Sequence, residues 1–113
     1  MLYLYPAEGH PTGPRDEPWF LLASDLIFPY RSHPLGVQGS PWYRLDGDMI
    51  YPAFGNLEVP LPHDNPHFRV EGHLCLPHDH HPLGRSDIPW YRFVNLAGNP
   101  TPPHGTRNFW TSH

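Results

Sequence analysis

Short runs of alternating apolar and polar residues recur along the chain, broken at small polar pairs. The clearest run lies between Pro41 and Pro52, with Asp46-Gly47 at its middle. An Asp-Gly pair between two such runs is typical of a type I′ hairpin turn, because both central residues of that turn need positive φ. A turn at Asp46-Gly47 pairs Tyr43 with Ile50. Because proline cannot donate to a ladder, the two prolines mark the strand ends. The pattern therefore predicts a hairpin of two short strands.

Alternation along these strands sorts the side chains onto two faces. One face carries large apolar residues such as Leu21, Phe28 and Tyr51. Because both faces are apolar, we expect each hairpin to be covered on both sides by neighbouring units. The opposite face, which we call the inner face, carries Phe20, Leu22, Ile27, Tyr43, Leu45, Ile50, Phe68, Val70, Cys75, Tyr91 and Phe93.

The chain repeats itself. His-Pro-Leu-Gly at 33–36, four variable residues and Pro-Trp-Tyr-Arg at 41–44 recur 48 positions later. Halving this period exposes weaker copies that begin at Pro18, Pro41, Pro66 and Pro89, with spacings of 23, 25 and 23 residues. We therefore expect one hairpin-repeat domain over residues 1–100, followed by a C-terminal tail at 101–113. Its parts are a half-unit at 1–17, units at 18–40, 41–65 and 66–88, and a half-unit at 89–100.

The repeat is out of phase at its two ends. The first residues align with the second strand of a hairpin, and the strand after Pro89 aligns with a first strand that has no good successor. Unpaired strand edges seek partners. The predicted fold is therefore an all-β tandem array of two-stranded hairpins, closed within the chain or completed between subunits. The expected assembly strands contain Leu2, Tyr3, Leu4 and Tyr5 at one end and Trp90, Tyr91, Arg92 and Phe93 at the other.

Composition supports a folded β protein. The 113 residues include 17 Pro and 10 Gly, and no proline-free stretch exceeds ten residues, so neither an average helix nor a membrane-spanning helix fits. A hydrophobic content of 38% exceeds that of disordered chains. With a formal charge of −4 and no lysine, we expect no nucleic-acid partner. The first residues show no secretory signal, which leaves the compartment open. The single Cys75 is expected to be a buried apolar residue.

Histidine is the ionisable group in excess. Three connectors carry His-Pro-x-Gly, at His10, His33 and His81, and we expect each imidazole to hydrogen-bond within its own connector. His78, His80 and His81 form the densest cluster and are candidate ligands of a divalent metal such as zinc, copper or nickel. Because the cluster has no recognised ligand spacing, adventitious binding is the alternative, and no cofactor is otherwise expected.

The repeated tryptophans allow two interpretations. Trp19, Trp42 and Trp90 hold equivalent places, and Arg44 and Arg92 follow two residues after their tryptophans. These residues either form a platform on which a glycan or small ligand stacks, or pack against neighbouring hairpins with Arg over the ring. No nucleophile, acid or base stands in a recognisable catalytic order, so we expect no catalytic residues and no enzyme activity.

The pattern His-Pro-x-Gly, Pro-Trp-Tyr-Arg and Gly-Asp-Met-Ile-Tyr-Pro resembles the short units of bacterial tandem-repeat proteins. The resemblance covers about residues 3–93, and the unit at Pro66 departs from it with His67 where tryptophan is expected. It implies a β-repeat fold and no particular activity.

The sequence thus predicts a non-enzymatic structural protein that self-associates by strand complementation between its two half-units. The first alternative is a closed monomeric ring that binds a glycan or small ligand through its tryptophans. The second is a histidine-rich metal-binding protein.

Overall fold

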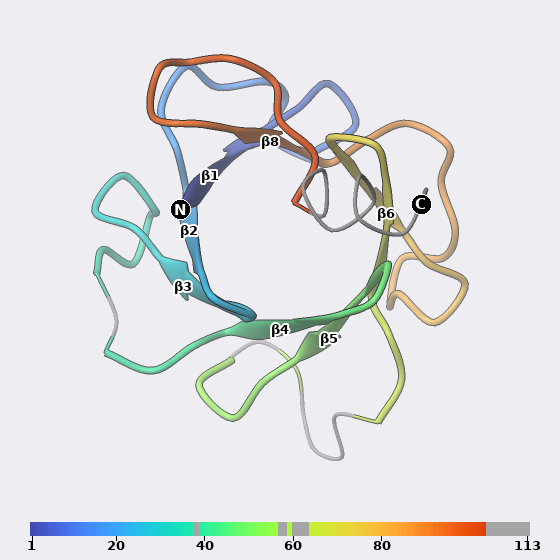
Figure 1. Ribbon diagram of the computed structural model, residues 1–113. Coiled ribbons are helices and arrows are strands. Elements are labelled where there is room, and N and C mark those ends of the chain that lie inside the picture. Colours follow the sequence, from blue (N-terminus) through green and yellow to red (C-terminus); the bar gives the residue numbers. More distant parts are fainter. Residues whose placement is uncertain (38, 57–58, 60–63, 104–113) are drawn as a thin grey trace, which may run out of the picture.

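The computed structural model describes residues 1–37, 39–56, 59, 64–103, and these form a closed barrel of antiparallel strands (Figure 1). Each strand pairs with its neighbours in chain order. Within the described residues there is no helix long and apolar enough to cross a membrane. The strands are β1 (Leu2–Pro6), β2 (Phe20–Ala23), β3 (Leu26–Pro29), β4 (Tyr43–Asp46), β5 (Met49–Pro52), β6 (Phe68–Glu71), β7 (Leu74–Pro77) and β8 (Tyr91–Val94).

The two half-units complete each other within the chain. β1 pairs with β8 in antiparallel register, with Leu4 opposite Phe93 and Tyr5 opposite Arg92. The same β1 pairs with β2 on its other side. The predicted all-β array of hairpins is therefore confirmed, and of its two possible closures the structure has the one within a single chain. A closed barrel leaves no strand edge free among the described strands.

The hairpin turns lie one residue later than we predicted. Leu45 pairs with Ile50 and Asp46 with Met49, so the loop is Gly47-Asp48. Gly47 has φ 61° as the first central residue. Positive φ at that position alone belongs to a type II′ turn, which places glycine first rather than second. The pairing shifts by two positions along the partner strand, so every side chain stays on its predicted face.

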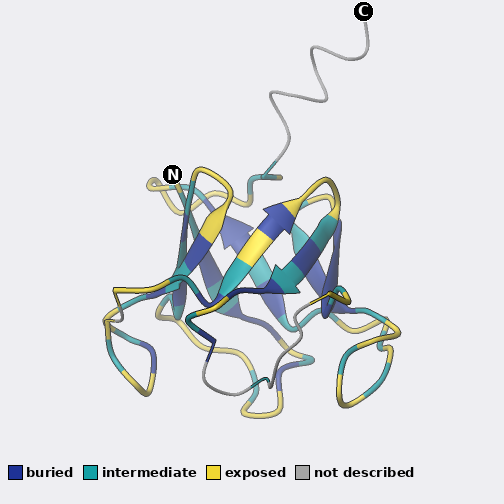
Figure 2. Ribbon diagram, turned by 90° about the horizontal axis from the view of Figure 1, so that it is seen from below, coloured by how far each residue is buried: buried dark blue, intermediate teal, exposed yellow. Residues whose placement is uncertain are grey.

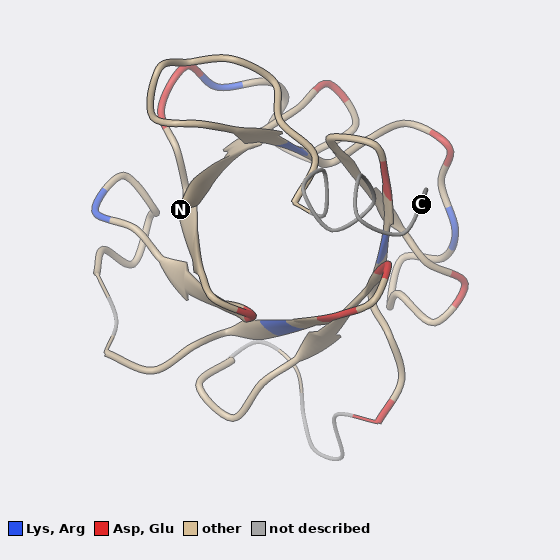
Figure 3. Ribbon diagram, viewed as in Figure 1, with Lys and Arg blue, Asp and Glu red and all other residues tan. Residues whose placement is uncertain are grey.

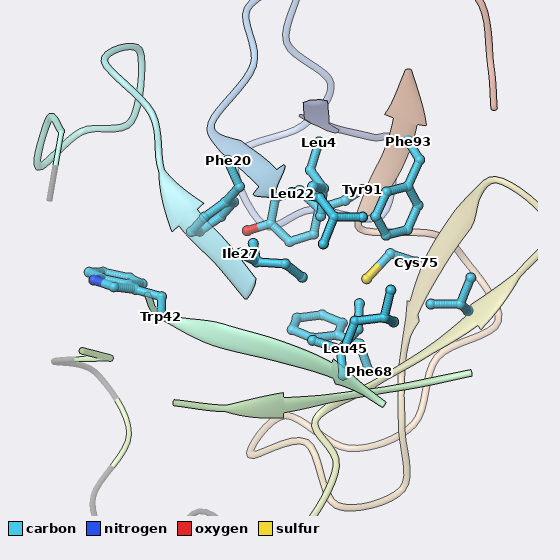
Figure 4. Packing of buried hydrophobic residues seen from close by; sticks show 12 residues of the cluster. Leu4, Phe20, Leu22, Ile27, Trp42, Leu45, Phe68, Cys75, Tyr91 and Phe93 are labelled. Atoms are coloured by element: carbon cyan, nitrogen blue, oxygen red, sulfur yellow. The ribbon is translucent and has the colours of Figure 1, made fainter. Parts of the chain in front are cut away.

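The predicted inner face fills the barrel. The strand register arranges the inner side chains in three tiers of four residues each. The first tier comes from the first residues of β2, β4, β6 and β8, and the second comes from the odd-numbered strands. The third tier comes from later residues of the even-numbered strands. An eight-stranded barrel is just wide enough for side chains to fill it. Figure 4 shows nine of these side chains directed into the barrel: Leu4, Phe20, Leu22, Ile27, Leu45, Phe68, Cys75, Tyr91 and Phe93. The tiers are Phe20, Tyr43, Phe68 and Tyr91; Leu4, Ile27, Ile50 and Cys75; and Leu22, Leu45, Val70 and Phe93.

The outer face is not covered by other hairpins, contrary to the prediction. The hairpins stand side by side in one sheet, so their outer side chains, such as Leu26 at 39% exposure, meet solvent or the connectors. Figure 3 shows that the acidic and basic residues of the described chain are interspersed around the ring.

The two ends of the barrel differ. Figure 2 shows the hairpin turns and the N-terminus at one end, and the long connectors between units gathered at the other. The connector after β1 is held against the segment that precedes β8 by backbone hydrogen bonds, such as the 2.8 Å bond from Gly9 N–H to the Pro89 carbonyl. The end that carries the connectors, called the connector end below, is where the histidine and tryptophan motifs meet.

Replacing Gly9 by alanine tests this contact. An added Cβ would lie 2.5 Å from the Ile88 carbonyl oxygen and 2.7 Å from that of Pro89, so the backbone of one segment must shift. We expect Gly9→Ala to lower the free energy of unfolding by about 1–3 kcal/mol in urea titrations. Gly39→Ala is the matched control, because nothing lies within 4 Å of its Cβ, and it should stay within about 0.5 kcal/mol of the parent. Equal effects of the two substitutions would contradict the contact.

Candidate ligand site at the connector end of the barrel

A closed ring of four aromatic side chains blocks the barrel at its connector end. These side chains belong to the first residues of β2, β4, β6 and β8, and each meets its neighbours in T-shaped contacts. Such edge-to-face pairs are the favoured geometry of aromatic rings. We call this tier the floor. Its centroid distances are 5.8 Å for Phe20–Tyr43, 5.7 Å for Tyr43–Phe68, 5.9 Å for Phe68–Tyr91 and 5.5 Å for Phe20–Tyr91.

Seven further rings stand beside the floor, and we call them the collar. They are the histidines of the three His-Pro-x-Gly connectors together with the residues that precede the four floor residues: His10, His33, His81, Trp19, Trp42, His67 and Trp90. Neighbouring rings alternate between the two groups. The centroid distances are 4.9 Å for Trp42–His33, 5.2 Å for His33–Trp19, 4.8 Å for Trp19–His10, 5.3 Å for His10–Trp90, 4.6 Å for Trp90–His81 and 5.6 Å for His81–His67.

Asn56 occupies the eighth place of this circle. It follows Pro52 by four residues, as His10 follows Pro6, although its connector has no His-Pro-x-Gly motif. Asn56 is 4% exposed and donates a 3.2 Å hydrogen bond from Nδ2 to the Trp42 carbonyl. The collar is therefore interrupted between Trp42 and His67, which makes one of the four sectors chemically different from the others.

The collar and three of the four floor rings, those of Phe20, Tyr43 and Tyr91, line a cavity of about 410 Å³. Connector residues such as Thr12 and Leu83 complete its wall. No lysine, arginine, aspartate or glutamate of the described chain lines it. Its volume falls in the range of small-molecule sites, about 300–1,000 Å³.

The three connector histidines share one hydrogen-bonding pattern. The backbone N–H two residues later donates to Nδ1, at 3.2 Å for His10, 3.1 Å for His33 and 3.0 Å for His81. The predicted bond within each connector is thus confirmed. Because Nδ1 accepts, a neutral ring carries its proton on Nε2. No described residue hydrogen-bonds to Nε2 of these rings, so each offers an N–H donor to a further partner.

Burial keeps these imidazoles neutral. It lowers the pKa of His10 to about 4, with smaller contributions from the charges of Arg15 and His33. The pKa of His81 is also lowered to about 4, by burial and then by His67. Burial lowers the pKa of His33 as well. At neutral pH the three connector histidines therefore present uncharged donors.

The structure separates the tryptophans from the arginines that we expected beside them. Trp42 is 1% exposed and belongs to the collar, whereas Arg44 points outward and stacks on Tyr51 at 4.3 Å. Arg92 likewise stacks on Tyr5 at 5.1 Å and donates to the Pro6 carbonyl. The predicted Arg–Trp stacking is wrong, because the alternation of faces holds only within the strands and both tryptophans precede their strands. Figure 4 shows Trp42 apart from the inner side chains.

The histidine cluster at 78–81 does not form a metal centre in the described chain. His78 and His80 stack with centroids 5.4 Å apart, while His81 belongs to the collar. Within the described ranges, no three His, Cys, Asp or Glu side chains are placed to hold a metal ion. Of the predicted tail, residues 104–113 lie outside the described residues.

Cys75 lies in the middle tier and is 1% exposed. Burial raises the pKa of its thiol above the ordinary value, so the thiolate that reacts with electrophiles is scarce. We expect Cys75 of the native protein to react with a disulfide reagent at least about 100-fold more slowly than in denaturant. Equal rates in the two states, measured by thiol titration, would place the side chain outside the core.

Comparisons with protein families, with curated proteins and with solved structures found no match for this chain.

Sequence reasoning found the tryptophans and connector histidines but missed three features of the site. These are the floor, the place of Asn56, and the presence of His67 in the collar. The sequence does indicate the place of Asn56, because Asn56 follows Pro52 by the same number of residues as His10 follows Pro6.

Proposed function

We propose that this protein binds a small ligand, of the class of a glycan or comparable organic molecule, in the cavity at the connector end. The observation that carries the proposal is the set of three neutral imidazoles, each held at Nδ1 by its own backbone and each with a donor at Nε2, around a cavity of about 410 Å³. Concave, largely aromatic sites with a few placed polar groups are the usual form of small-molecule sites.

The bonds within the connectors account for Nδ1 of the three histidines but leave their Nε2–H donors without a partner among the described residues. His10 and His33 are 9% and 7% exposed, and each accepts a backbone hydrogen bond at Nδ1. An aliphatic or phenyl side chain would fill the same space but would remove that acceptor and the Nε2–H donor. The collar also contains Trp42 Nε1, which is buried and has no hydrogen-bond partner in the part of the chain that the structure describes. A bound ligand with acceptor oxygens would pair with the Nε2–H donors of the connector histidines.

The fold supports binding by giving the site a rigid base. Each floor ring starts a strand that is paired on both sides, so backbone ladders and T-shaped contacts both hold it in place. A preorganised site loses less conformational entropy on binding.

The test is a ligand screen on the full chain by ligand-observed NMR, with sugars, amino acids, nucleosides, organic acids and amines as probes. Changes in tryptophan fluorescence report engagement of the collar. We expect at least one class to bind, and His33→Leu to weaken that binding while the exposed His80→Gln leaves it unchanged. The proposal fails if no class binds, or if the ligands that bind are unaffected by His33→Leu.

Self-assembly through the half-units is the second candidate. One observation favours it: β1 joins the barrel at the chain terminus and is linked to β2 by a connector of 13 residues, 7–19, so it is an element that two chains could exchange. Strand exchange would keep every pairing of β1 and β8 but make it between chains. Light scattering over a concentration series, with negative-stain electron microscopy of the same samples, tests this candidate. Growth into fibres would support it, and a monomer of 13.0 kDa at all concentrations would refute it.

A further inference from the structure

The collar places its three donors in different sectors of the cavity wall. His10 and His33 lie on either side of Trp19, at 4.8 and 5.2 Å between ring centroids. His10 and His81 lie on either side of Trp90, at 5.3 and 4.6 Å. A ring therefore separates each donor from the next. In the described chain these histidines do not converge on a point that could hold a metal ion. A ligand that meets several of the donors must carry several acceptor atoms spread over an organic framework.

The cavity wall also selects against charge. An anion would enter a site with no cationic side chain in its described wall, and desolvating an ion without a counter-charge is costly. A cation would find aromatic faces, which attract it, but also Nε2–H donors, whose positive ends repel it, and no carboxylate from the residues that the structure describes. The three Nδ1 acceptors do not help, because the backbone N–H groups of Thr12, Leu35 and Leu83 already occupy them.

The tryptophans between the donors provide apolar surface. Trp19 and Trp90 are partly buried and both line the cavity. A ligand that fits between such donors and such rings has acceptor oxygens around its edge and C–H groups on its faces. Saturated sugar rings have this distribution of groups.

We propose, building on the proposed small-ligand function, that the cavity recognises an uncharged sugar whose hydroxyl or ring oxygens accept hydrogen bonds from Nε2–H of His10, His33 and His81. The C–H faces of the sugar pack on Trp19 and Trp90. The cavity of about 410 Å³ accommodates a single sugar or the end of a longer glycan.

The first measurement concerns the histidines themselves and needs no ligand. In 15N-histidine spectra of the full chain at pH 7.5, the imidazoles of His10, His33 and His81 should show a protonated Nε2 and an unprotonated Nδ1. Protonation of Nδ1 in any of the three would overturn the assigned donors.

The second measurement titrates four probe classes into the full chain and follows the collar histidine and tryptophan signals by NMR. The probes are neutral methyl glycosides, uronic acids, tetramethylammonium and inorganic phosphate. Neutral glycosides should perturb the collar at lower concentration than their uronic acid counterparts. His33→Phe keeps a ring and removes one donor, and should weaken glycoside binding about tenfold. His80→Phe is the matched control on an exposed connector position and should leave binding unchanged.

The outcomes separate this inference from the function on which it rests. If a charged probe perturbs the collar and neutral glycosides do not, the site binds small ligands but the sugar assignment is wrong. If glycosides bind and His33→Phe has no effect, recognition by the histidine donors is wrong. If neither these probes nor the wider screen perturbs the collar, the proposed function itself fails.

Discussion

Deleting residues 1–6 is expected to unfold the chain rather than leave a folded open array. The deletion removes Leu4, which is 2% exposed in the middle tier, and leaves β2 and β8 each without a partner on one side. Replacing a buried leucine by alanine alone costs about 2–5 kcal/mol. Added to the loss of two ladders, this approaches the whole stability of a small domain, about 5–15 kcal/mol. Circular dichroism and urea titration of the truncated chain measure the effect.

Two single substitutions calibrate this result. Leu4→Ala should lower the free energy of unfolding by about 2–5 kcal/mol, and Leu26→Ala, on the outer face of β3 at 39% exposure, by less than about 1 kcal/mol. A peptide of residues 1–7 added in trans should restore part of the folded signal, because it can re-form both ladders. A truncated chain that stays folded while the full chain polymerises would instead show that the half-units pair between chains.

Acidification from pH 7 to pH 4 is expected to destabilise the fold by about 3 kcal/mol. His10 and His81 have an ordinary pKa of 6.5 and a folded-state pKa of about 4. The unfolded chain therefore takes up protons below pH 6.5 that the folded chain accepts only near pH 4. The contribution of these two histidines to stability is constant above pH 7 and falls as the pH drops through this window. Two pKa shifts of this size amount to about 6–7 kcal/mol, and we reduce the total by about half because solvent reaches the cavity.

Urea titrations at half-unit pH intervals test this prediction. His81→Phe should lower the number of protons taken up on unfolding by about one between pH 4 and 6.5, and should therefore reduce the slope of stability against pH in that range. The exposed His80→Gln should leave the slope unchanged. If His81→Phe and the parent had the same slope, His81 would not be held neutral by the collar.

Local pattern predicted much of the architecture. The period of 23–25 residues, the hairpins and the inner face all follow from residues near one another in the chain. The turn position did not follow, because an Asp-Gly pair serves both a turn at Asp46-Gly47 and one at Gly47-Asp48. The two registers differ by two positions, so they present the same faces, and the hydrophobic pattern cannot distinguish them.

The candidate site depended on contacts that the chain pattern does not contain. Trp42 was predicted beside Arg44 from strand alternation, yet it precedes β4 and its nearest aromatic neighbour is His33 of the preceding connector. The floor joins Phe20 to Tyr91, residues 71 positions apart, because β2 and β8 both pair with β1.

By itself the sequence determined the repeated unit, its two-stranded form and the residues that face inward, because turn chemistry, proline positions and alternation act over a few residues. Only the tertiary structure decided that the half-units meet within one chain, since the edge of a strand offers the same hydrogen bonds to its own chain as to another. Closure also decided the cavity. It brings three connectors and four strand starts to one end of a barrel, and the distances among their rings follow from the curvature of the sheet rather than from their spacing along the chain.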